Sequence, residues 1–346
     1  MRTAVRYRRV LIGLALLLAV AFLLAVAVGA VWVAPWSTVR LLGWKLGVWG
    51  RPEDVARSTE VIVFQLRLPR VLLAAVVGGA LAASGTVFQG LFRNALADPA
   101  IIGVSSGAAL GAVLVIVTVG AGSLGAFSVP LAAFCGAMAT AVIVYRLARI
   151  GPTVHVATLL LAGIAMAAVI SSLMSLAMSF SGEEIRDIYA WLLGGLVAQG
   201  WRSVAVVAPV VVVGLAGATL VSHELNLVAL GEERAAQLGV EVDRLKRRAI
   251  AVGALLAAAA VSVAGVIGFV GLMTPHLLRL TIGADHRRLL PAAVLGGASL
   301  LILADLAART VIAPSELPVG VITALLGGPF FLFLLRHEGR RAGARG

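Results

Sequence analysis

Charged residues are scarce in this sequence of 346 residues: Asp, Glu, Lys and Arg make up 13% of it, whereas hydrophobic residues make up 61%. Ordinary soluble domains carry roughly 25% charged residues. A composition so poor in charge argues against a soluble globular protein and predicts a polytopic membrane protein. No polar linker divides the chain, so we expect a single transmembrane domain over residues 1–346.

The motifs of several enzyme and metal-protein classes are also missing. The single cysteine, Cys135, excludes a disulfide framework and a cysteine-based metal site. No G-x-x-x-x-G-K-[ST] loop is present to bind nucleotide phosphates, and the five histidines form no H-E-x-x-H pattern. We therefore predict no catalytic residue, no cofactor and no resident metal, and we expect ATP hydrolysis to take place in another subunit.

The net charge of +12 could indicate a nucleic-acid partner. The basic residues, however, lie between apolar runs and do not gather on one hydrophilic surface. Cytoplasmic loops of membrane proteins are enriched in Lys and Arg, which explains this placement better. We predict contact with a lipid bilayer and no nucleic-acid partner.

Long apolar runs are abundant. A bilayer core of about 30 Å needs about 20 apolar residues per helix. Nine runs approach or exceed that length: 10–33, 71–91, 100–119, 126–148, 156–180, 203–221, 250–271, 289–308 and 318–335. If both basic termini are cytoplasmic, the number of crossings is even, and we assign the tenth to a short broken helix over 273–283 that starts near Pro275. The predicted fold is an all-α transmembrane bundle of about ten spans, with a periplasmic loop at 34–66 and a cytoplasmic loop at 222–248.

Two predicted spans share an order of features. "RLPR" precedes an apolar helix that ends in "SGTVFQGL" and a proline-containing break, and "DRLKRR" precedes one that ends in "AGVIGFVGL" and "MTPH". The first begins outside and the second inside, so they resemble inverted-topology repeats with broken helices near the membrane midplane. Our candidates for these breaks and for a translocation path are Gln89, Asn94, Pro99, Gly268, Gly271, Pro275 and His276. His276 could be an axial ligand for an iron complex, but a lone imidazole is more often a structural group.

The polar stretch 222–248 contains a candidate contact for another protein. Residues 229–238 can form a short helix bracketed by Gly231 and Gly239. Its polar Glu232 and Glu233 and its apolar Leu230 and Leu238 could seat one face in a groove of a motor subunit. A solvated connector is the alternative interpretation.

Eight motifs occur in order from Arg67 almost to the C-terminus. They are "RLPR" at 67–70, "SGTVFQGLFRNALADPAIIGVSSGAALGA" at 84–112, "LLLAGIA" at 159–165, "ALGEERAAQLGV" at 229–240, "GVIGFVGLMTPHLLRL" at 265–280, "GADHRRLLPAAVLGGA" at 283–298, "LADLAAR" at 303–309 and "ELPVGVITALLGGPFFLFLL" at 316–335. With these motifs the chain resembles the FecCD-type permeases of type II ABC importers. One departure is visible, because the family usually has Asn-Pro-Leu-Ala where this chain has "NALA" at 94–97.

The resemblance implies a set of partners. It implies a homodimer of two ten-span copies with the path between them, two ATP-binding cassette subunits on the cytoplasmic side and a periplasmic substrate-binding protein, in the bacterial inner membrane. Residues 229–240 would couple to the ATPase. Arg67, Arg70 and Arg309 match family positions that meet acidic residues of the binding protein, although anchoring at helix ends is an alternative.

The resemblance also bears on the cargo. The family carries ferric siderophores, haem, cobalamin and some oxyanions, and "EEIRDIYAWLLGGL" at 183–196 resembles the haem-type members. We predict import of an iron chelate, either haem or a ferric siderophore, with cobalamin as the alternative. An ion-gradient-driven secondary transporter is a further alternative, for which Asp305 is the clear intramembrane candidate. A structural or signalling role would not need two broken helices.

Overall fold

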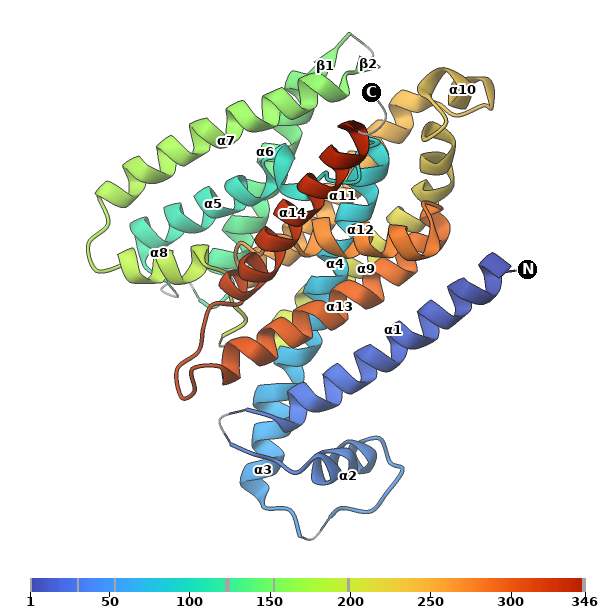
Figure 1. Ribbon diagram of the computed structural model, residues 1–346. Helices are drawn as coiled ribbons and strands as arrows, with labels where there is room; N and C mark the ends of the chain where they lie inside the picture. Colours follow the sequence, from blue (N-terminus) through green and yellow to red (C-terminus); the bar gives the residue numbers. More distant parts are fainter. Residues whose placement is uncertain are drawn as a thin grey trace.

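Almost every apolar run of the sequence forms a helix. The computed structural model describes residues 2–29, 31–52, 54–121, 125–151, 153–197 and 200–343. Its elements, in chain order, are α1 Arg2–Ala27, α2 Pro35–Lys45, α3 Arg57–Val61, the π-helical η1 Ile62–Arg67, α4 Leu68–Leu91, the 3-10 helix η2 Pro99–Ile102, α5 Val104–Val119, α6 Ser128–Ala148, β1 Arg149–Ile150, β2 Thr153–Val154, α7 Val156–Ser179, α8 Ile185–Leu192, α9 Trp201–Val228, α10 Glu232–Gln237, α11 Val242–Ala264, α12 Val270–Ile282, α13 His286–Thr310 and α14 Val319–Gly343 (Figure 1).

The predicted all-α transmembrane class is confirmed. Seven helices are long and apolar enough to cross a membrane, and two shorter apolar helices, Val104–Val119 and Val319–Leu334, add to them among the described residues. The strands β1 and β2 form only a two-residue antiparallel hairpin, in which Arg149 pairs with Val154. The bundle is therefore helical throughout its membrane part.

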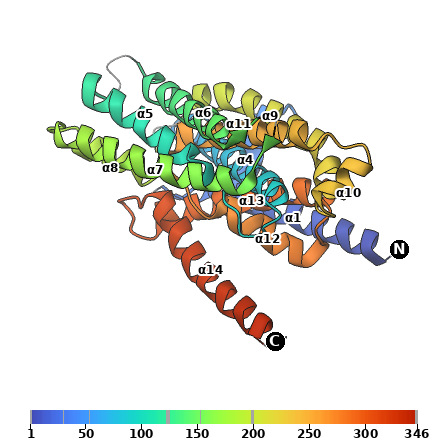
Figure 2. The ribbon, with the colours of Figure 1, turned by 90° about the horizontal axis from the view of Figure 1, so that it is seen from above.

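Helices α4 and α11 form the centre of the bundle. In the most apolar part of the span Arg57–Leu91, which contains α4, 83% of the residues are buried, and the share is 72% for α11. For the peripheral helix α7 the share is 17%. Seen from above, α4 lies among α9, α11, α12 and α13, and α14 leaves the body at an angle (Figure 2). The peripheral helices carry large exposed apolar side chains, which is the pattern expected of a surface in contact with lipid.

Small residues let the central helices approach closely. A Cβ atom on Gly78 of α4 would lie only 2.2 Å from the carbonyl oxygen of Gly297 in α13. In lipid, such close backbone contact replaces the hydrophobic driving force between helices. The α4–α13 contact therefore depends on glycine at both positions.

The two ends of the bundle differ. At one end, α2 and α3 lie beyond the end of α1, and we call this the α2 end; α10 lies at the opposite end, the α10 end (Figure 1). The expected loop 34–66 is largely helical, because Pro35–Lys45 is α2 and the helix that contains α4 already begins at Arg57. The expected loop 222–248 is also shorter than predicted, since α9 continues to Val228 and α11 starts at Val242.

Candidate functional site

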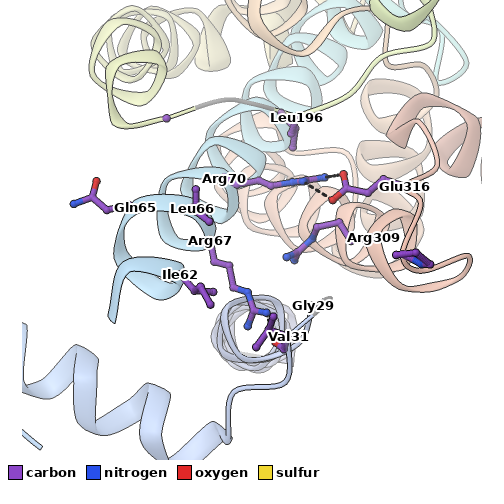
Figure 3. A pocket seen from close by; sticks show the side chains of 12 residues that line it. Gly29, Val31, Ile62, Gln65, Leu66, Arg67, Arg70, Leu196, Arg309 and Glu316 are labelled. Atoms are coloured by element: carbon purple, nitrogen blue, oxygen red, sulfur yellow. Dashed lines mark hydrogen bonds and ion pairs between the residues drawn. The ribbon is translucent and has the colours of Figure 1, made fainter. Parts of the chain in front are cut away.

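A cavity of about 440 Å³ opens at the α2 end. Arg67, Arg70, Arg309 and Glu316 contribute to its lining, so the three arginines predicted to act together do lie in one place (Figure 3). Arg67 comes from the end of η1, Arg70 from the first turn of α4 and Arg309 from the last turn of α13. The consecutive elements η1 and α4 and the distant helix α13 thus build one basic pocket.

Arg67 is engaged by the end of α1. Its side chain donates to the carbonyl oxygens of Val26 and Ala27 at 3.0 and 2.7 Å, and also to that of Val31. The last carbonyl groups of a helix lack donors within the helix. Arg67 supplies them, which explains why α1 ends at Ala27 rather than near residue 33 as the apolar run predicted.

Asp305 lies between the other two arginines. Its carboxylate is 2.9 Å from Nη2 of Arg70 and 3.1 Å from Nε of Arg309, and its side chain is only 1% exposed. Arg70 also contacts Glu316 at 2.9 Å, and Arg309 donates to the carbonyl oxygen of Ala25 at 3.0 Å. Arg70 and Arg309 are therefore charge-compensated within the chain.

The exposure of these side chains differs in a way that matters for docking. Arg67 and Arg309 are each 6% exposed, whereas the side chain of Glu316 is 35% exposed and that of Arg70 12%. The geometry gives Arg67 and Arg309 structural partners and leaves Arg70 and Glu316 nearest to the rim. Docking through all three arginines stays a prediction.

At the α10 end, residues 92–103 form the turn between α4 and α5. Arg93 has a φ of 49°, and the Asn94 side chain accepts a hydrogen bond from the amide of Leu96 at 2.9 Å. Asp98 then accepts from the amide of Ala100 at 2.8 Å and starts η2 at Pro99. Asn94 and Asp98 close the turn by side-chain hydrogen bonds, so the proline that the family usually has after Asn94 is not required here.

The second break lies between α11 and α12, but not where the sequence analysis put it. Helix α11 ends at Ala264 and α12 begins at Val270. The span expected over 250–271 was therefore too long, and Pro275 lies inside α12 rather than at its start. Gly265, with a φ of 66°, and Phe269, with a φ of 67°, bound the break, because a left-handed residue interrupts a right-handed helix.

The break is held by backbone from two other elements. A Cβ atom on Gly265 would lie 2.2 Å from the carbonyl oxygen of Trp191, and the amide of Gly195 donates to the carbonyl oxygen of Ala264 at 2.8 Å. Gly320, in the first turn of α14, would place a Cβ atom 2.3 Å from the carbonyl oxygen of Leu193. Sequence reasoning missed these contacts, although "LLGG" at 192–195 was a visible signal.

The two breaks meet at the contact between α4 and α12. A Cβ atom on Gly85 would overlap the carbonyl oxygen of Gly271. A Cβ atom on Gly271 would lie 3.2 Å from the ring of Pro99. Pro275 has no amide hydrogen, so it cannot donate to the carbonyl of Gly271 four residues earlier. Helix α4 approaches that carbonyl, and Gln89 donates to the next one, Leu272, at 3.1 Å.

The structure brings only part of the predicted path residues to this junction. Gln89, Pro99 and Gly271 lie together there, whereas a Cβ atom on Gly268 would meet nothing within 4 Å. His276 is 3% exposed, and its ring lies 6.3 Å from that of Phe330 in α14 in an edge-on arrangement. Burial against an aromatic ring favours packing over ligation for His276.

The predicted short helix at the α10 end is present. It covers Glu232–Gln237, with Gly231 at a φ of 113° and Gly239 at 87°, so both glycines lie outside it in conformations that favour glycine. Leu230 and Leu238 flank the helix and are 58% and 60% exposed. Glu232 is held by Lys246 at 2.7 Å, a partner that sequence reasoning missed.

A shallow cavity of about 320 Å³ joins the two features of the α10 end. Arg93 from the α4–α5 turn lines it together with residues 230–234. The turn after α4 and the short helix α10 therefore share one surface. This surface is where a subunit that binds α10 would also touch the turn after α4.

Comparison with known proteins decides the family. A model of the FecCD transport family matches residues 17–337. The chain belongs to the FecCD transport family. It is therefore a membrane permease component of an ABC transporter.

Two relatives of this FecCD-family chain are named for different cargoes. It is 48% identical over 288 residues to a cobalamin import system permease protein, BtuC, of Halobacterium salinarum, covering 83% of this chain and 77% of that protein. It is 47% identical over 297 residues to a hemin transport system permease protein, HmuU, of Yersinia pestis, covering 82% of this chain and 85% of that protein. A solved structure described as an inward-facing metal-chelate type ABC transporter superposes with a TM-score of 0.82 at 31% identity, covering 95% and 99% of the two chains.

Proposed function

We propose that this FecCD-family permease imports an iron chelate, haem or a ferric siderophore, across the bacterial inner membrane at the expense of ATP hydrolysed by a separate subunit. The chain is 47% identical to a hemin permease over most of both chains. The feature that favours an iron chelate over cobalamin is the segment "EEIRDIYAWLLGGL" at 183–196, which resembles the haem-type members. The similarity to a metal-chelate type transporter over 95% of this chain supports the same cargo class.

Cobalamin import is the second candidate. The identity to a cobalamin permease, 48%, is as high as that to the hemin permease. Both cargoes are large metal-centred rings or chelates. Overall similarity alone therefore does not separate them.

A secondary transporter is the weaker alternative. Such a protein needs an ionisable group inside its spans for ion coupling. Asp305, the candidate, is bound by both Arg70 and Arg309, so its charge already serves the α2-end network. Ion coupling would have to release that carboxylate from two cations.

We assign the two ends of the bundle to different partners. The exposed leucines beside α10 suit an ATP-binding cassette subunit, and the basic pocket at the α2 end suits a substrate-binding protein. In this orientation both termini are cytoplasmic, and two copies of the chain form the transporter with the path between them.

Transport in proteoliposomes tests the cargo. The purified permease is reconstituted with its ATPase and binding protein, and ATP-dependent uptake of haem, a ferric siderophore and cobalamin is measured under the same conditions. We expect haem or the siderophore to be taken up at least about tenfold faster than cobalamin. Faster cobalamin uptake would establish the second candidate instead, and uptake driven by an ion gradient without ATP would establish a secondary transporter.

A further inference from the structure

A groove at the α2 end lies beside the basic pocket, with which it shares Gln65, and has no part in the transport cycle described above. Its volume is about 550 Å³, and its lining comes from α1, α2, the helix that begins at Arg57, and the first residue of α9. The apolar side chains of the lining are Phe22, Leu42, Leu46, Val61, Phe64, Leu68 and Trp201. The polar residues of the lining are Lys45, Glu60 and Gln65, and the carboxylate of Glu60 is paired with Arg51.

The surroundings of the groove have the composition of a membrane interface. Of the six tryptophans in the chain, Trp32, Trp36, Trp44, Trp49 and Trp201 belong to this end. Trp32 and Trp36 are 67% and 66% exposed, and Leu46 is 81% exposed. Tryptophan is enriched where a membrane protein crosses the headgroup region, because its ring is apolar and its N–H is polar.

The groove is continuous with the lipid-facing surface of α1. Phe22 lines the groove, and Ala19 and Ala15, which lie on the same face of α1 about one and two turns earlier, are exposed. An acyl chain of the bilayer can therefore enter the groove from the side without leaving an apolar environment. A peptide or a soluble ligand would have to cross the headgroup region first.

One cation stands at the mouth of the groove. The Nζ atom of Lys45 lies 5.2 Å from the ring centre of Trp44 and 5.4 Å from that of Phe64. Neighbouring arginines are paired with carboxylates, Arg40 with Asp54 at 2.8 Å and Arg51 with Glu60 at 3.1 Å. Within the described ranges, Lys45 has aromatic neighbours and no carboxylate in an ion pair, so its charge is available to an anion.

We infer that this groove binds a bilayer phospholipid, with an acyl chain along Phe22, Leu42 and Phe64 and the phosphate group against Lys45. An aliphatic chain fits the apolar wall, and the phosphate complements the lysine at its mouth. The interfacial tryptophans then surround the bound headgroup. This assignment is independent of which chelate the permease carries.

Photolabelling tests the groove. The full-length chain is reconstituted in phosphatidylcholine vesicles that contain phosphatidylglycerol with a diazirine on one acyl chain, and the labelled peptides are mapped. We expect label on residues 42–46 and 60–68, and Lys45→Glu should lower that label about fivefold because a cation near the surface becomes an anion. Val61→Trp should also lower it, because residue 61 lines the groove and is 53% exposed.

Arg202→Glu is the matched control. Arg202 is an exposed cation next to Trp201 that does not line the groove, so its reversal should leave the labelling unchanged. Equal losses in Lys45→Glu and Arg202→Glu would overturn the headgroup assignment. Labelling that is unaffected by both Lys45→Glu and Val61→Trp would overturn the site. Absence of label from the groove, as when a second copy of the chain covers it, would overturn it as well.

A second measurement needs no substitution. The chain has two lysines, Lys45 and Lys246, and the latter is buried and paired with Glu232. The rate at which an amine-reactive reagent labels Lys45 is divided by the rate for Lys246. This ratio should fall at least about threefold when phosphatidylglycerol is added to the phosphatidylcholine vesicles. Equal reactivity in both lipids would contradict phosphate binding by Lys45.

Discussion

Asp305 is the carboxylate on which the network at the α2 end depends. It is 1% exposed and contacts both Arg70 and Arg309. Asp305→Ala should lower the free energy of unfolding by about 3–5 kcal/mol, because two buried guanidinium groups lose their shared counterion. Thermal unfolding of the detergent-solubilised protein measures the effect.

Glu316→Gln is the control for that prediction. Glu316 contacts the same Arg70 but is 35% exposed, so its removal should cost no more than about 1 kcal/mol. If the two variants unfolded at the same temperature, Asp305 would not be the centre of the network.

Arg70 is the arginine best placed to meet a binding protein. We expect Arg70→Gln to weaken binding of the substrate-binding protein at least about tenfold, because a charge-assisted contact is lost while Arg309 still compensates Asp305. Titration calorimetry with the permease in nanodiscs measures the affinity. Arg202 is an exposed cation at the same end, so the Arg202→Gln permease should bind the substrate-binding protein as tightly as the parent does. An unchanged affinity for the Arg70→Gln permease would remove Arg70 from the docking surface.

At the scale of an element, the break between α11 and α12 depends on Gly265. Gly265→Ala should destabilise the protein by about 2–3 kcal/mol, because alanine is strained at a φ of 66° and its Cβ would lie 2.2 Å from the carbonyl oxygen of Trp191. Gly268→Ala, in the same break, should change stability by less than about 0.5 kcal/mol, since nothing lies within 4 Å of the new methyl group. Melting of both variants checks the contrast, and equal melting temperatures would contradict it.

The existence of the helices could be predicted from the sequence, but some of their ends could not. A run of about 20 apolar residues identifies a span by itself. The end of α1, however, is set by Arg67, 40 residues further along the chain, and the break after α11 is set by Gly265 and Phe269 rather than by Pro275. Capping by a distant side chain and a left-handed φ leave no local signal as visible as a proline.

The same limit applies to the site. The sequence placed Arg67, Arg70 and Arg309 at one end of the bundle, and the structure brings them into one pocket. It did not predict how far Arg67 and Arg309 are buried, because burial depends on α1 covering them. The pairing of Lys246 with Glu232 is also a tertiary contact between α10 and α11.

Helix α10 is expected to transmit ATP hydrolysis through its flanking leucines. Leu238→Glu should abolish transport-coupled ATPase activity without preventing insertion, because Leu238 is 60% exposed and contributes little to the core. Stimulated ATPase activity of the assembled complex measures this. Glu241→Gln, with a side chain that is 64% exposed beside α10, should retain the coupling, and normal coupling in Leu238→Glu would make α10 a mere connector.

At the scale of the whole molecule, α14 is a helix that the rest of the chain covers only in part. It leaves the body of the bundle (Figure 2), and Leu325, Leu326, Leu332 and Phe333 on it are all more than half exposed. Exposed leucines alone could simply face lipid. A helix that departs from its own bundle, however, gains packing partners if a second copy of the chain lies against it.

We therefore expect Leu325→Arg to separate the two copies of the chain in the transporter that we propose. The control is Leu16→Arg in α1, because Leu16 and Leu325 are 62% and 66% exposed and an arginine inside a bilayer costs about 2.5–3.5 kcal/mol in either helix. Co-purification of two differently tagged copies should fall severalfold for Leu325→Arg and stay at the parental level for Leu16→Arg. The two substitutions have the same cost of membrane insertion and differ only in position. Equal co-purification of the two tagged copies in both variants would therefore place the dimer contact elsewhere.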